Sequence, residues 1–316
     1  MISRNKAAVL IATYNKAVVF DRCLLALSVI KRRDLFDFFV VDNNSTDQNK
    51  KILENYSNVK YLHESKNYYA SKALNDGFNK FNLSDKYKYI FIMAHDVLVD
   101  KNTLYELLQM MKSHPSLGML GATHFEFGTS IIRTTGHSIN RSTSLLHNFI
   151  SYKRKARLNH FSSLFVTTTE LYKKIGGFND ILFPMIYEEP DFGERILDEG
   201  YQIKCCAGAK IWHPIEIKKS DKTEKIQTRI ERIYSTKAKS YLFFRNRILY
   251  MSLHAGFLRF LIFYFIFYPI IFLYYFTKVD HKLKKYAVKG FIDGSVFGFT
   301  KNQNYIKMRN KKILNI

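Results

Sequence analysis

The first part of the chain alternates short apolar runs with longer amphipathic segments. Unbroken apolar runs of about four to eight residues are typical of strands buried on both faces, and the longer segments have helical length. The pattern predicts strands at Ala8–Ala12, Phe36–Val41, Val59–His63 and Tyr89–Ala94, separated by helices at 16–31, 47–56, 69–81 and 101–112. Such strand–helix units form an open, mostly parallel α/β sheet flanked by helices.

Polar residues occupy the ends of three of these predicted strands, at Thr13–Asn15, Asp42–Asp47 and His95–Asp96. In an open α/β sheet, ligands bind where the chain leaves the carboxyl ends of the strands. A carboxylate there, such as Asp96, can hold a hard divalent cation that completes its shell with water and substrate phosphate oxygens. The residues after Asp42 also suit an ordinary turn and helix N-cap. The sequence therefore predicts a polar site at this edge of the sheet.

The last hundred residues differ in character from the rest. Eight basic residues lie between 218 and 239, and Phe260–Phe276 is apolar or aromatic throughout, with Pro269 near its middle. This length is at the lower limit for crossing a hydrocarbon core of about 30 Å. The proline, the aromatic residues and the flanking cations favour a bent or paired helix in the membrane interface, and a buried core helix is the alternative. We therefore predict two domains, residues 1–216 and a helical membrane-associating region, residues 217–316.

The distribution of charge supports this division. The 316 residues include 49 Lys+Arg and 27 Asp+Glu, a net charge of +22. Residues 1–216 carry +6 of this charge and residues 217–316 carry +16. Because the excess surrounds an apolar segment, an anionic membrane surface is the expected partner, and nucleic acid is not. Three cysteines without a disulfide or metal-site spacing, and an N-terminus without a signal-peptide core, favour the cytosolic side.

Seven short motifs follow one another over roughly residues 7–215. They are IATYN (11–15), VVDNNSTD (40–47), NYYASKALNDG (67–77), HDVLVD (95–100), GGFND (176–180), YEEPDFGERILDEGY (187–201) and WHP (212–214). In this order the chain resembles the inverting glycosyltransferases of family 2, which have a GT-A fold. The tail, YLFFRNRIL followed by an apolar aromatic region and KGFIDGSVFG, is similar to the rhamnosyltransferase-like members that build bacterial surface polysaccharides. The resemblance implies a nucleotide-diphosphate sugar as donor.

The resemblance also implies roles for residues at the matching positions. The donor would be bound by Thr13, Asn15, Asp42, Asn67, Asn75 and Asp96. Asp42 would accept the imide N–H of uracil or thymine. Asp96 matches the last carboxylate of the family's Asp-X-Asp metal motif, and His213 would complete a site for Mn or Mg. The first position of that motif is Ala94 here, so the element is one ligand short, and His95 could compensate.

The acidic stretch YEEPD supplies candidates for a base that deprotonates an acceptor hydroxyl. Glu189 matches the family's usual Asp and is the first candidate, and Glu188 is the second. Crowding with Asp191 would raise the pKa of at least one of these carboxyl groups. The same acids fit a helix N-terminus, where they complement the dipole, and both interpretations can hold together. Asp191 and Trp212 are expected on the acceptor side, although a tryptophan beside a strand can also belong to the core.

Together with the apolar, basic tail, the resemblance implies a membrane-associated hexosyl- or deoxyhexosyltransferase. It would face the cytoplasm, peripherally or through a re-entrant or short spanning C-terminal helix, and pass sugars to a lipid-linked glycan acceptor in cell-surface polysaccharide synthesis. The basic run at Lys153–Lys155 and Arg157 could meet an acceptor pyrophosphate, with a solvated loop as the alternative. Two other functions stay open: a basic membrane-binding protein without catalysis, and a sugar-phosphate nucleotidyltransferase. The sequence lacks the glycine-rich basic phosphate loop that favours the latter.

Overall fold

The computed structural model describes residues 3–152, 157–213 and 235–316, in two compact units. Unit 1 comprises Met1–Ser138, His147–Phe178 and Phe192–Ile217. Unit 2 comprises Ile139–Leu146, Asn179–Asp191 and Lys218–Ile316. Unit 2 thus takes in two segments from the first 216 residues, and the predicted boundary at residue 216 itself lies outside the described residues.

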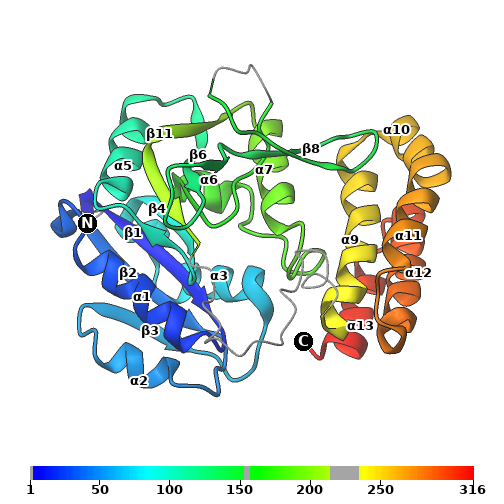
Figure 1. Cartoon of the computed structure of the whole chain (residues 1–316), viewed down its shortest axis with the longest axis horizontal. Coiled ribbons are helices and arrows are strands. Elements are labelled where there is room, and N and C mark those ends of the chain that lie inside the picture. The colour runs from blue at the N-terminus through cyan, green and yellow to red at the C-terminus, as the bar shows by residue number, and fades with distance from the viewer. Residues whose placement is uncertain (1–2, 153–156, 214–234) are drawn as a thin grey trace. The chain divides into compact units, whose positions relative to one another are not determined.

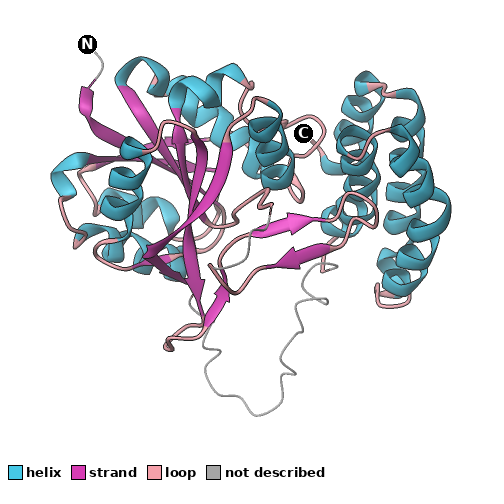
Figure 2. Cartoon of the chain, turned by 90° about the horizontal axis from the view of Figure 1, so that it is seen from above, coloured by secondary structure: helices cyan, strands magenta, loops and turns pink. Residues whose placement is uncertain are grey.

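Unit 1 is built on a mixed β-sheet, drawn in magenta in Figure 2. Its strands are β1 (Ser3–Thr13), β2 (Phe36–Asp42), β3 (Val59–His63), β4 (Tyr87–Ala94), β5 (Leu98–Val99), β6 (Leu117–Phe125), β7 (Ile132–Thr134), β10 (Leu164–Thr168) and β11 (Gln202–Trp212). The order is β3-β2-β1-β4-β10-β6-β11-β5, and β7 pairs with β6. The first four strands in this order run parallel, which confirms the predicted arrangement, and β10 lies antiparallel between β4 and β6.

Helices cover both faces of this sheet (Figure 1). They are α1 (Ala17–Ser28), α2 (Asn49–Glu54), α3 (Tyr69–Lys80), α4 (Leu83–Lys86), α5 (Thr103–Ser113), α6 (Thr169–Lys174) and α7 (Glu188–Asp198), with a 3-10 turn at Arg33–Leu35. Val9 and Ile11 share an apolar cluster with α1 and α5, whereas Ala8 and Leu10 share another with α3 and α6. Because both faces of β1 are buried, its sequence shows an unbroken apolar run. The four predicted strand–helix pairs are confirmed within a few residues.

The unit boundary falls inside α7, whose first four residues belong to unit 2. A separate two-stranded sheet pairs β8 (His137–Ile139) with β9 (Leu146–Asn148).

The C-terminal part of unit 2 is helical. Its elements are α9 (Lys237–His254), α10 (Phe257–Ile262), a π-helical segment (Phe263–Phe267), α11 (Tyr268–Phe276), a 3-10 turn (His281–Leu283), α12 (Lys284–Thr300) and α13 (Gln303–Leu314). Helix α12 packs directly on the backbone of α9, because Gly290 and Gly294 face it: a Cβ at Gly290 would lie 2.3 Å from Tyr241 O. The π-helical segment ends just before Pro269, which has no N–H to donate to the preceding turn.

Among the described residues, one helical stretch, Phe257–Phe276, is long and apolar enough to cross a membrane, with a mean hydropathy of 2.0. One side of it packs inside unit 2 through Phe260, Phe263 and Tyr268. Eight apolar residues on its other side are exposed, and we call these the exposed apolar face: Phe257, Leu258, Ile262, Phe265, Ile266, Ile270, Leu273 and Tyr274. Exposed lysines follow in the next turn and the start of α12, at Lys278, Lys282, Lys285 and Lys289.

Candidate active site

The carboxyl ends of β1, β2 and β4 lie side by side in unit 1, because these strands are parallel neighbours. Thr13 pairs in register with Asp42, and Ala12 pairs with Ala94. Asp96 follows β4 by two residues. The structure therefore brings Thr13, Asp42 and Asp96 to one edge of the sheet, the position at which α/β sheets bind ligands. We call this the donor edge.

Thr13 is buried and fixed by a polar network. Asn49 Nδ2 donates to Thr13 Oγ1 (3.0 Å) and to Ser45 Oγ (2.9 Å). The backbone N–H of Asn15 donates to Ser45 Oγ (3.0 Å), and Asn15 Oδ1 accepts from the N–H of Thr46 (2.8 Å). Asn15 has a φ of 49°, a left-handed conformation that asparagine tolerates. The loops after β1 and β2 are thus linked by hydrogen bonds, and Asn49 is a member of the network that was not predicted.

The two carboxylate oxygens of Asp42 have different surroundings. The side chain is buried, and His63 Nδ1 lies 2.7 Å from Oδ2. Within the described part of the chain, Oδ1 is buried without a hydrogen-bond partner. Leaving a buried acceptor unpaired costs roughly 1–3 kcal/mol, so a ligand N–H that bonds here is favoured. His63 was not predicted, although it pairs in register with Asp42 from the end of the neighbouring parallel strand.

Asn67 and Asn75 both hold segments of backbone. Asn67 Oδ1 accepts from Asn43 Nδ2 (3.0 Å) and from the N–H of Tyr69 (2.8 Å), so it belongs to the loop beside Asp42. Asn75 lies in α3, where its Nδ2 donates to Phe178 O (2.8 Å) and its Oδ1 accepts from the N–H of Phe178 (3.0 Å). Asn75 therefore anchors a neighbouring loop to α3.

Asp96 and His213 lie together at the donor edge. His213 Nδ1 is 3.1 Å from Asp96 O and 3.5 Å from Asp96 Oδ1. His213 Nε2 is 2.7 Å from Ser163 Oγ. His95, the predicted substitute ligand, has its Nδ1 3.1 Å from Ala12 O. The pair of Asp96 and His213 is therefore the part of the expected metal site that the structure assembles.

This pair fits a cation that takes most of its ligands from substrate and water. In the described residues, no group of three or more His, Cys, Asp and Glu side chains could hold a metal ion. The Asp96 side chain is 41% exposed, so its carboxylate is accessible to such a cation. Magnesium commonly binds one or two carboxylates and completes its shell with water and phosphate oxygens.

Glu188 and Glu189 begin α7 in the part that belongs to unit 2. Burial raises the pKa of Glu189 to about 7. Burial, and next the charge of Glu189, hold the pKa of Glu188 well above its usual range. Glu188 Oε2 is buried and has no hydrogen-bond partner among the described residues. A carboxyl group whose pKa lies near neutrality is suited to act as a general base.

The two residues expected on the acceptor side belong to different units. Asp191, in unit 2, is buried with its Oδ1 3.0 Å from His254 Nε2. Trp212 ends β11 in unit 1 and is half-buried. Within the predicted basic run, Arg157 makes a bidentate pair with Glu194 at 2.7 and 3.1 Å. The rest of that run lies outside the described residues.

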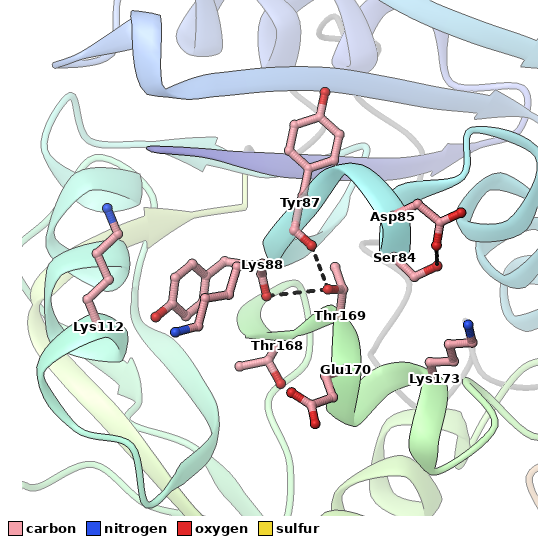
Figure 3. Close-up of a pocket in the computed structure, with 10 residues that line it drawn as sticks. Ser84, Asp85, Tyr87, Lys88, Lys112, Thr168, Thr169, Glu170 and Lys173 are labelled. Atoms are coloured by element: carbon pink, nitrogen blue, oxygen red, sulfur yellow. Dashed lines mark hydrogen bonds between the residues drawn. The ribbon is translucent and has the colours of Figure 1, made fainter. Parts of the chain in front are cut away.

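A cavity of about 860 Å³ lies at the opposite edge of the same sheet (Figure 3). It is lined by Ser84, Asp85, Tyr87, Lys88, Tyr89, Lys112, Thr168, Thr169, Glu170 and Lys173. Thr169 Oγ1 donates to Tyr87 O at 2.6 Å, beside the start of β4. None of the predicted site residues is among these lining residues, so we assign the cavity no part in the chemistry.

Comparison with known proteins gives one family match. The family model described as "Glycosyl transferase family 2" matches residues 8–175. A comparison with the curated proteins finds no match.

Solved structures resemble the chain in fold. GalNAc-T7 with UDP, GalNAc and Mn2+ has a TM-score of 0.58 and 14% identity, over 77% of this chain and 51% of that one. S. aureus TarS 1–349 with UDP-GlcNAc has a TM-score of 0.55 and 15% identity, over 97% and 92%. The mannosyltransferase PcManGT from Pyrobaculum calidifontis, with GDP-Man and Mn2+, has a TM-score of 0.54 and 13% identity, over 98% and 87%. The chain therefore spans about half of the first structure and most of the other two.

Proposed function

Because the chain belongs to glycosyl transferase family 2, we propose that it transfers a sugar from a nucleotide diphosphate to a lipid-linked glycan, with inversion at the anomeric carbon. The chain is a glycosyltransferase with a GT-A-type fold. The observation that carries the proposal is the donor edge, where Thr13, Asp42 and Asp96 end neighbouring parallel strands. A role in cell-surface polysaccharide synthesis, with a hexose or deoxyhexose as the sugar, belongs to the same proposal.

Asp42 is the proposed contact for the nucleotide base. Its Oδ1 would accept the imide N–H of uracil or thymine, while its Oδ2 keeps the contact with His63. Cytosine presents an acceptor at the same ring position, so the carboxylate would repel it. Thr13, Asn15 and Asn67 hold the surrounding loops in place. This arrangement favours UDP- and dTDP-sugars as donors, and the S. aureus neighbour was solved with UDP-GlcNAc.

Asp96 and His213 are the proposed protein ligands for a divalent cation, Mn or Mg. A cation bound there would offset the charge on the departing diphosphate. His213 Nδ1 faces Asp96 O and its Nε2 lies 2.7 Å from Ser163 Oγ, so the imidazole would exchange one of these contacts for a metal. An imidazole ligand suits Mn better than Mg. Two of the structural neighbours, GalNAc-T7 and PcManGT, were solved with Mn2+.

Glu189 is the proposed general base, and Glu188 is the second candidate. The Glu189 carboxylate takes the proton from an acceptor hydroxyl. That oxygen forms a bond to the anomeric carbon from the face opposite the diphosphate, and the bond to the diphosphate oxygen breaks with its electron pair leaving on the diphosphate. A pKa of about 7 leaves much of Glu189 ionised at neutral pH and still basic enough to accept the proton.

Unit 2 is proposed to seat the enzyme at the cytoplasmic face of the membrane. The exposed apolar face together with the lysines that follow it makes an amphipathic surface of the kind that enters a lipid interface. Each cation near an anionic surface contributes about 1 kcal/mol to binding. Because the other side of the same helix packs inside unit 2, we favour peripheral membrane association over a membrane-spanning helix. A lipid-linked acceptor presents its pyrophosphate at the same level.

The proposal is tested by incubating the purified chain with a panel of UDP-, dTDP-, GDP- and CDP-sugars and Mn2+, and by measuring the nucleoside diphosphate released. Vesicles carrying extracted lipid-linked glycans are added in a parallel series. We expect release from a UDP- or dTDP-sugar that depends on metal and increases with the vesicles. The Glu189→Gln variant, purified in the same way, is the control for contaminating hydrolases. Absence of release from every donor, or equal release by this variant, contradicts the proposal.

A further inference from the structure

The turn before Glu188 has a strained backbone. Ile186 and Tyr187 have φ angles of 66° and 75°. The left-handed region is unfavourable for a non-glycine residue, and a β-branched residue is a true outlier there. Conformations of this kind persist only where the surrounding structure holds them. The two strained residues directly precede Glu188 and Glu189, the first two residues of α7, so their conformation sets the direction in which α7 begins.

Helix α9 supplies the groups that hold this turn, and all of them belong to unit 2. Asn246 Nδ2 donates to Met185 O (3.0 Å) and to Ile186 O (2.6 Å). Arg245 Nη2 donates to Leu182 O (2.6 Å). Two consecutive side chains of α9 therefore bind three carbonyl groups within the five residues Leu182–Ile186.

Arg245 and Asn246 are themselves fixed in orientation, and both are fully buried. Arg245 Nε donates to Asn246 Oδ1 (2.8 Å), so the amide of Asn246 must point its Nδ2 toward the turn. Arg245 Nη1 donates to Asn310 Oδ1, and Asn310 Nδ2 donates to Ile181 O (2.7 Å). The hydrogen bonds from α9 and α13 thus converge on the same segment.

Stability alone does not explain this arrangement. Burying a guanidinium costs several kcal/mol, and apolar residues of similar volume often pack a helix equally well or better. What the polar pair provides is a set of directed hydrogen bonds to one strained turn.

We propose that Asn246, oriented by Arg245, is a positioning residue that keeps Ile186 and Tyr187 in their left-handed conformation. It thereby sets the orientation of the carboxyl groups of Glu188 and Glu189. This inference rests on the proposed role of Glu189 as the base. The C-terminal helices would then support the proposed base, in addition to their proposed contact with the membrane.

The first test is Asn246→Ala. We expect kcat for diphosphate release to fall about 10- to 100-fold, while the KM for donor and the affinity for UDP stay within about twofold. The matched control is Tyr305→Phe, which removes another hydrogen bond of unit 2, from Tyr305 Oη to Asp293 Oδ1 (2.6 Å), and leaves Arg245, Asn246 and the turn in place. An equal fall of kcat in both variants would mean that only the stability of unit 2 matters, and would overturn the inference.

The second test is rescue by relief of strain. In the Asn246→Ala background, Ile186→Gly and Ile186→Ala remove nearly the same side chain, but only glycine adopts a positive φ without penalty. We expect the glycine variant to recover at least about fivefold in kcat and the alanine variant to recover none. Equal kcat in the two double variants contradicts the positioning role. If Asn246→Ala does not accumulate, Asn246→Ser replaces it, since its hydroxyl can still donate to one carbonyl and a smaller loss is expected.

A third measurement separates this inference from the proposed function. Amide hydrogen exchange over 179–191 should be faster in Asn246→Ala than in the parent chain, and unchanged in Tyr305→Phe. Unchanged exchange in Asn246→Ala overturns the inference even if the enzyme is active. If Glu189→Gln retains full turnover, the proposed base is wrong and the inference falls with it. If Glu189→Gln is inactive and Asn246→Ala turns over at the parent rate, the positioning role alone is refuted.

Discussion

In unit 1 the sheet itself places the donor edge, whereas in unit 2 the turn that carries Glu188 and Glu189 is held by side chains from a distant helix. Thr13 and Asp42 are adjacent because β1 and β2 pair in register. The turn depends on Asn246, which lies 61 residues after Met185 in the chain. One set of residues is therefore placed by backbone hydrogen bonds between paired strands, and the contacts that Asn49 and His63 make with Thr13 and Asp42 are to their side chains. The other is positioned by two buried side chains.

The difference separates two ways to lose activity. Substitutions at the donor edge should remove a direct contact with donor or metal and leave the frame intact, because a β-sheet is cooperative and buried on both faces. Substitutions around the turn should change turnover through the orientation of a carboxylate, with binding preserved. The following predictions test this division in order of expected effect.

Glu189→Gln should have the largest effect. We expect kcat to fall about 10²- to 10⁴-fold, because the amide keeps the shape of the side chain but cannot accept the acceptor proton. UDP affinity, measured by calorimetry, should stay within about twofold because the donor edge is untouched. Glu188→Gln is the matched control and should lose less. If Glu188→Gln shows the large loss and Glu189→Gln does not, the base has been assigned one residue too far along the chain.

Asp96→Ala tests whether a residue of the donor edge acts through a direct contact with the metal. We expect turnover to fall roughly 10²- to 10³-fold, equivalent to the several kcal/mol that a cation contributes at a departing diphosphate. The thermal midpoint should change little, since the carboxylate is 41% exposed. The control is Asp100→Ala, which removes the bond that the N–H of Asn102 donates to Asp100 Oδ1 (2.9 Å) and should keep the response to Mn2+. An Asp96→Ala enzyme that still responds to Mn2+ argues against the proposed ligand set.

Asp42→Asn should change which base is bound. With its carbonyl oxygen toward His63, the asparagine would present an N–H where Asp42 Oδ1 now lies. We expect UDP affinity to fall roughly 10- to 100-fold, the value of a hydrogen bond to a charged group, and CDP affinity to rise relative to UDP. Calorimetry with both nucleotides measures the ratio. An unchanged ratio would place the base elsewhere.

Substitutions on the exposed apolar face of unit 2 should have the smallest effect on the turnover of the purified enzyme. We expect the triple variant Phe265→Asn, Ile270→Asn, Leu273→Asn to bind anionic vesicles at least about tenfold more weakly, since it removes three exposed apolar side chains. Diphosphate release from donor alone should stay near the parent value. The matched control changes three exposed residues, Val18 and Leu25 of α1 and Val29 directly after it, to Asn and should leave sedimentation with vesicles unchanged. Equal loss in the two triple variants would contradict a specific membrane face.

The contrast between the two regions also explains what the sequence could predict. Strands such as Phe36–Asp42 have a local signal, an unbroken apolar run, and parallel neighbours bring their ends to one edge. The position of the donor edge therefore followed from the pattern alone. The partners within it, His63 and Asn49, required the register of the strands and the course of the loops, which short-range periodicity does not specify.

The support of the turn could not be predicted, because it joins residues far apart in the chain. A weak signal was present: Arg245, Asn246 and Arg247 interrupt the apolar run YLFFRNRILYM. Buried polar groups in such a run need partners, so their presence indicates a specific contact. Which segment they bind is decided by tertiary structure. The segment before Pro269 is π-helical in the structure, whereas the sequence predicted only a bent helix or a pair of helices.

The most direct test of the account is the pH dependence of the single-turnover rate in the parent chain and in Glu189→Gln. Glu189 is active as a base when ionised, so the parent rate should rise with pH and level off above its pKa of about 7. Glu188→Gln and His254→Gln, measured in parallel, separate two other titratable groups from Glu189: the adjacent Glu188, and His254 of α9, which contacts Asp191. The account predicts that Glu189→Gln is slow and flat from about pH 5.5 to about pH 8 while its UDP affinity is kept. A parent rate that does not change over this range, or the same rise in Glu189→Gln, would contradict it.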